Sequence, residues 1–187
     1  MEKINNGIIR NEAGKDGLIL GLVTVVFMFA SQFAGKIGSP ALSGVLGFFL
    51  WLAKFLGCIF LMRWFMSRLV AKYEGVIGAD TFRLGVWIAL FSALILSAFT
   101  LVNMLYISPD AVSESFDQIF AQMGPMLDSN SQEALTALEP KMPVIAFFSN
   151  LIYCFLFGVI LSAILSRNIP KADPFAEVKV DDDDDVI

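Results

Sequence analysis

The sequence predicts an all-α integral membrane protein with four transmembrane helices and an amphipathic helical insertion between helices 3 and 4. Hydrophobic residues make up 57% of the chain and the mean hydropathy is +0.71, which places it outside the range of soluble proteins. Four apolar runs have the length of a membrane-spanning helix and carry no charge or a single one. These runs cover about residues 17–33, 41–62, 84–107 and 144–166.

The runs form one membrane domain, residues 17–166, between two polar segments. Residues 1–16 have mixed charge and no cleavage pattern after a short apolar core, so we expect no removed signal peptide. Residues 167–187 are acidic and typical of a disordered tail, whose aspartates suit docking on a partner. Lys and Arg are concentrated in these two segments and in residues 63–83, so we expect both termini in the cytoplasm and the helical loop 108–143 outside.

The second run is unusual because Lys54 lies close to its middle. A central lysine disfavours insertion by about 3 kcal/mol, whereas the Leu, Ile, Phe and Val residues of the run together favour it by about 5 kcal/mol. The segment should therefore still insert. Lys54 lies ~13 Å above Arg63 along a helix, near the midplane of the hydrocarbon layer.

No Asp or Glu occurs in the four runs, so the spans of this chain offer Lys54 no counter-charge. One interpretation is that Lys54 snorkels along Leu50 and Trp51, or meets carbonyls, hydroxyls or water inside the bundle. The other is that it meets an anion from outside the chain, either a lipid phosphate or a partner's carboxylate.

Small residues suggest where the first two helices pack. The spacing Gly17-x-x-x-Gly21 is a close-packing motif in membrane helices, although ordinary glycine content explains it equally well. In the second run Gly44, Gly47 and Gly57 are expected to leave the helix surface flat for a neighbour.

The third run follows a turn in which Asp80 is the expected N-cap. Ser92 lies nine residues above Arg83, the spacing that also separates Lys54 from Arg63, so Ser92 and Lys54 are expected at one depth. The run also carries a stripe of small and polar residues: Gly85, Ala89, Ser92, Ala93, Thr100 and Asn103.

The sequence of the loop 108–143 predicts two helices. Apolar residues from Val112 to Leu127 recur at three and four positions, opposite Asp110, Glu114 and Asp117, and we expect this amphipathic helix to end near Gly124-Pro125. Asn130 and Glu133 stand at capping-box spacing for a second helix. The apolar face either covers the outer mouth of the bundle as a lid or contacts a partner.

In the fourth run, small and polar residues recur at intervals of four, which favours helix packing, with lining of a polar cavity as the alternative. They are Asn150, Cys154, Gly158, Ser162 and Ser166.

The chain lacks the usual catalytic and metal-binding groups. It has no His, and its two cysteines, Cys58 and Cys154, fall inside spans at different depths, where we interpret them as packing residues. We expect no cofactor, metal or catalytic residue. The segment Glu74–Gly78 lacks the lysine and the context of a phosphate loop, so we expect neither nucleotide binding nor a nucleic-acid partner.

Most of the chain, roughly residues 15–176, resembles a bacterial family named domain of unknown function 4199. The stretches that carry the resemblance are WLAKFLGCIFLMRWFM (51–66), TFRLGVWIALFSALILSAF (81–99), SPDAVSESFDQIFAQMGPMLDSNS (108–131) and FFSNLIYCFLFGVILSAILSRNIPKADPF (147–175). The resemblance implies a four-span inner-membrane protein with no established activity. Similar proteins are often encoded beside a polyprenyl-phosphate glycosyltransferase of family 2, which is an association and not a mechanism.

Three functions are compatible with these features. The first is a noncatalytic membrane subunit or anchor for such a glycosyltransferase, with Lys54 near the lipid phosphate. The second is a small transporter or lipid flippase, as a homo-oligomer, with Lys54, Ser92 and the Asn150 stripe along its path. The third is a structural or assembly protein in which Lys54 pairs with a partner's carboxylate. An enzyme is least favoured, since it would rest on Lys54 activating Ser92.

Overall fold

The computed structural model describes residues 4–35, 40–123, 126 and 128–169. Within this part of the chain four helical stretches are long and apolar enough to cross a membrane, and the predicted all-α membrane fold is confirmed. The main helices are α1 (Asn6–Gly35), α2 (Pro40–Lys72), α3 (Gly78–Val102), α4 (Asp110–Met123), α5 (Ser129–Leu138) and α6 (Met142–Asn168). A π-helical segment, η1 (Asn103–Ile107), follows α3, and a 3-10 turn, η3 (Glu139–Lys141), precedes α6.

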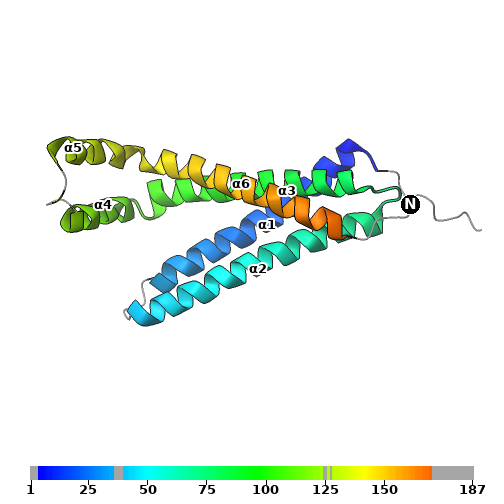
Figure 1. The fold of residues 1–187 in the computed structure, drawn as a ribbon, viewed down its shortest axis with the longest axis horizontal. Helices are drawn as coiled ribbons and strands as arrows, with labels where there is room; N and C mark the ends of the chain where they lie inside the picture. The colour runs from blue at the N-terminus through cyan, green and yellow to red at the C-terminus, as the bar shows by residue number, and fades with distance from the viewer. Residues whose placement is uncertain (1–3, 36–39, 124–125, 127, 170–187) are drawn as a thin grey trace, which may run out of the picture.

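Two antiparallel pairs, α1 with α2 and α3 with α6, form the bundle (Figure 1). The pairs lie together where α1 begins and α6 ends, which we call the terminal end, and they diverge toward the opposite, loop end (Figure 1). α3 packs along both α1 and α6, whereas α2 contacts mainly α1. α3 is therefore the central helix, and α2 is the most exposed of the four.

Close packing around α3 depends on small residues. A Cβ at Gly17 would lie 2.7 Å from the Phe91 Cβ, and one at Gly21 would lie 2.8 Å from the Ile95 Cβ, so the Gly17-x-x-x-Gly21 motif does bring α1 against α3. On the other side of α3, Gly158 faces Ala89 in the same way. These contacts set the crossing of α3 with both neighbours.

The glycines of α2 do not have this role in the described chain. A Cβ at Gly44, Gly47 or Gly57 would meet no described atom within 4 Å. No described neighbour uses the flat surface that these glycines were expected to provide, because α2 turns most of its length away from α3 and α6, and a neighbour from outside the chain stays a prediction.

The helices extend beyond the apolar runs. α1 begins at Asn6, inside the segment expected to precede the membrane domain, and the Asn5 side chain caps it by accepting the Ile8 N–H at 2.9 Å. α3 begins at Gly78, and Asp80 is its third residue and not its N-cap. Asp80 reaches back to accept the Ile77 N–H at 3.1 Å, as an acid at this position of a helix does.

The insertion lies away from α1 and α2. α4 and α5 continue the α3–α6 pair at the loop end and lie away from the ends of α1 and α2 (Figure 1). Asp128, two residues before the expected Asn130, caps α5 by accepting the Ser131 N–H at 3.0 Å. Hydrogen bonds from Ser131 lower the pKa of Asp128 below its ordinary value.

Gly158→Ala and Gly57→Ala are expected to change stability in opposite directions. The methyl at residue 158 meets Ala89, and overpacking of this kind costs about 1–3 kcal/mol. The methyl at residue 57 enters open space and favours the helix by up to about 1 kcal/mol. Thermal unfolding in mild detergent measures both. Equal losses would mean that α2 packs against a surface outside this chain.

Candidate functional site

The candidate site is centred on Lys54, near the middle of α2. Its partly buried side chain lines two cavities between the helices, and Leu96 of α3 also lines both. The first cavity extends from this level toward the terminal end, and the second extends toward the loop end. Lys54 therefore lies where the two cavities meet.

The first cavity, of about 180 Å³, is mostly apolar. Three residues predicted from the sequence line it with Lys54, namely Ser92, Cys154 and Gly158. The Ser92 hydroxyl donates to the Ala89 carbonyl at 3.2 Å and makes no hydrogen bond to Lys54. The remaining lining residues are Leu20, Thr24, Trp51, Phe55, Cys58, Met62, Ala89, Leu96, Tyr153, Phe157 and Leu161.

The second cavity, of about 410 Å³, is more polar. Asn150, predicted from the α6 stripe, lines it together with Gln32 of α1, which the sequence analysis did not single out. The sequence feature that could have identified Gln32 is that its polar amide stands near the end of an otherwise apolar run, residues 17–33. The other lining residues are Phe27, Met28, Ser31, Lys54, Leu96 and Thr100.

Two other predicted residues serve packing or lie elsewhere. The Ser162 hydroxyl, fully buried, donates to the Phe82 carbonyl at 3.0 Å and joins α6 to α3. Asn103 begins the π-helical segment η1, is buried and lines neither cavity. Its Oδ1 atom has no hydrogen-bond partner in the described chain.

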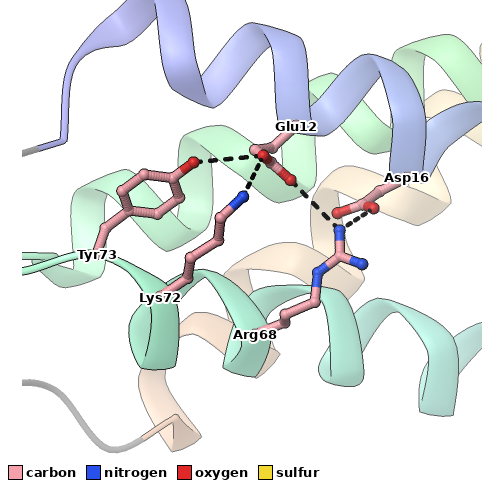
Figure 2. Close-up of polar contacts among 5 residues, drawn as sticks. All are labelled: Glu12, Asp16, Arg68, Lys72 and Tyr73. Atoms are coloured by element: carbon pink, nitrogen blue, oxygen red, sulfur yellow. Dashed lines mark hydrogen bonds and ion pairs between the residues drawn. The ribbon is translucent and has the colours of Figure 1, made fainter. Parts of the chain in front are cut away.

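No described carboxylate forms an ion pair with Lys54, and the ion pairs of the bundle lie at its terminal end. There Asp16 of α1 accepts from Arg68 of α2 at 2.6 Å (Figure 2). Glu12, one turn earlier, accepts from Lys72 at 2.8 Å and from the Tyr73 hydroxyl at 3.3 Å, and lies 3.4 Å from Arg68. We call these five residues the terminal clamp.

The terminal clamp holds α1 against α2. Only 2% of the Asp16 side chain is exposed, so Arg68 compensates a charge that water does not reach. The Arg68 guanidinium also lies over the Trp64 ring, 5.3 Å from its centroid. Sequence reasoning missed the clamp, although Glu12 with Asp16 and Arg68 with Lys72 each stand four residues apart, on one face of a helix.

The comparisons with known proteins give one match. The family described as "Protein of unknown function (DUF4199)" matches residues 15–167. No curated protein and no solved structure matches the chain.

Arg68→Met is expected to destabilise the protein more than Asp16→Asn. Removing Arg68 leaves the buried Asp16 carboxylate without its ion-pair partner and lowers the free energy of unfolding by about 3–5 kcal/mol. Removing the Asp16 charge leaves Arg68, 38% exposed, free to turn to solvent. Thermal unfolding of the two variants and of the double variant measures this order, and the double variant should recover part of the loss. A larger loss for Asp16→Asn would contradict this account of the clamp.

Proposed function

We propose that this chain, which belongs to the DUF4199 family of proteins of unknown function, is a noncatalytic membrane subunit that holds a lipid phosphate at Lys54 for a partner enzyme. The observation that carries the proposal is a central ammonium group beside a cavity, without a carboxylate partner in the described chain.

The cost of a charge inside the hydrocarbon layer supports an external anion. An isolated ammonium group is disfavoured there, and a phosphate oxygen supplies both the opposite charge and a hydrogen-bond acceptor. A partner's carboxylate would do the same. The cavities favour the phosphate, because they leave room for a ligand beside Lys54 between the helices of this one chain.

The partner class comes from the family resemblance, which implies a polyprenyl-phosphate glycosyltransferase of family 2. The charge distribution supports a bacterial inner-membrane protein with its terminal end in the cytoplasm, where such an enzyme would contact it. α1 begins and α6 ends at that same end, beside the α2–α3 turn (Figure 1). The acidic tail that we expect to dock on the partner lies outside the described residues from 170 onward.

Lys54→Met is expected to reduce the bound lipid phosphate about tenfold, because a hydrogen bond to a charged group is worth about 1.5–3 kcal/mol. The variant should unfold at the same temperature or a higher one, since it removes an uncompensated charge. The measurement is purification from native membranes in mild detergent, with mass spectrometry of proteins and lipids. Lys141→Ala, outside the cavities, is the control. A chain that purifies alone, with the same phospholipids in all samples, would exclude this function.

A small transporter or flippase is the second candidate, favoured by the cavities that extend from Lys54 in both directions along the bundle. On this alternative, labelled lipid phosphate should cross proteoliposome membranes, and Lys54→Met should slow it severalfold while Lys141→Ala does not. No flux above empty liposomes would exclude transport and leave the subunit function standing.

A further inference from the structure

We propose that Gln32, Lys54 and Asn150 form one phosphate site, and that its ligand is a lipid phosphodiester with an uncharged, hydroxyl-bearing headgroup. The inference rests on the proposed function and deepens it, because it names the other binding residues, the class of ligand and the side on which the headgroup lies. A phosphodiester of this kind corresponds to the glycosylated lipid product of such an enzyme and not to its polyprenyl-phosphate acceptor, which is a monoester.

Three side chains that make no hydrogen bond to a described residue gather in the second cavity, and together they offer more donors than acceptors. Gln32, Lys54 and Asn150 come from α1, α2 and α6, and none of them donates a hydrogen bond to another described residue. An amide carries two N–H donors and a lysine three. Donors without partners are costly inside a membrane, so three helices that direct them to one cavity indicate an acceptor with several oxygens.

Among lipid phosphates, charge favours a phosphodiester. Lys54 is the only charged side chain among the described residues that line either cavity. A phosphodiester has one negative charge and is neutralised by one lysine, whereas a monoester has about 1.5–2 negative charges at pH 7 and would leave an excess inside the bundle. The two neutral amides then bind phosphate oxygens without adding charge.

The two cavities separate the polar and apolar parts of the ligand. In the second cavity the Ser31 hydroxyl donates to the Phe27 carbonyl at 2.8 Å, and the Thr100 hydroxyl donates to the Leu96 carbonyl at 2.9 Å. Both hydroxyl oxygens are left as acceptors, which suits a headgroup that donates O–H groups. The first cavity offers apolar walls such as Met62 and Leu161 for the lipid chain. The headgroup therefore lies toward the loop end, away from the terminal end at which the partner would contact the chain, so the site retains the lipid and does not present its headgroup to the partner.

The test measures lipid binding to the full chain in dodecyl maltoside micelles by native mass spectrometry. Lysophosphatidylglycerol is the probe, because it is a phosphodiester with one chain and an uncharged glycerol headgroup. Wild type should bind it about tenfold more tightly than lysophosphatidylcholine of equal chain length, whose cationic headgroup opposes Lys54, and than the monoester dodecyl phosphate. Inorganic phosphate alone should not displace it.

Gln32→Leu and Asn150→Leu should each weaken lysophosphatidylglycerol binding about tenfold, since each removes hydrogen bonds to a charged acceptor. Gln118→Leu on the exposed surface of α4 should leave binding unchanged and is the matched control. Thermal unfolding of each variant establishes that it is folded.

Each contrary result has a distinct meaning. Loss of binding in Lys54→Met with no change in the two amide variants would overturn the three-residue site and leave the proposed function intact. Binding that no variant changes would overturn both. Preference for dodecyl phosphate would overturn the phosphodiester class, and full displacement by inorganic phosphate would show that the ligand is free phosphate and not a lipid.

Discussion

The hydrocarbon layer offers no water to a polar group, and this constraint divides the polar side chains of the protein into two kinds. Some are satisfied inside the chain. Ser162 bonds to a carbonyl of the neighbouring helix, and Asp16 and Glu12 are paired with basic residues of α2. Lys54, Gln32 and Asn150 are not satisfied by described residues, and they share one cavity. Asn103 Oδ1 and Ser97 Oγ are also without a partner in the described chain, but they line neither cavity, so the candidate site is distinguished by three such side chains from three helices at one cavity.

The same division explains why the bundle is tight at one end and divergent at the other. The terminal clamp and the contacts of Gly17 and Gly158 hold the helices together over the terminal half. Toward the loop end, α1 and α2 separate from α3 and α6, and the polar cavity lies on that side of Lys54 (Figure 1). Close packing at the terminal end therefore supports a candidate site whose polar cavity lies on the divergent side.

The fold class was predictable from the sequence because the length and apolarity of a membrane helix are local properties. The common cavity of Lys54 and Ser92 followed from the rise of a helix, since both residues stand nine positions above an arginine that marks the interface. The glycines show the limit of such reasoning. Gly21 and Gly57 look alike in sequence, but only Gly21 faces a neighbour, because packing partners depend on how the helices cross.

The terminal clamp and Gln32 were missed for related reasons. Asp16 lies one residue before the first apolar run, and its partner Arg68 is distant in the sequence and follows the second run, so analysis of the runs alone included neither. Gln32 becomes a candidate binding residue only because it lines the same cavity as Lys54 and Asn150, which lie on other helices. Pairings between distant residues require the topology of the bundle.

The passage from α5 through η3 into α6 links the membrane domain to the surface. Helical structure continues from Ser129 to Asn168, over 40 residues, and at 1.5 Å per residue it reaches roughly 60 Å, twice the thickness of the hydrocarbon layer. Asn150 of the cavity and α5 therefore belong to one continuous helical stretch. If the proposed lipid binds beside Asn150, a small tilt of α6 would become a larger displacement at the far end of α5, and occupancy of the cavity would change the surface there.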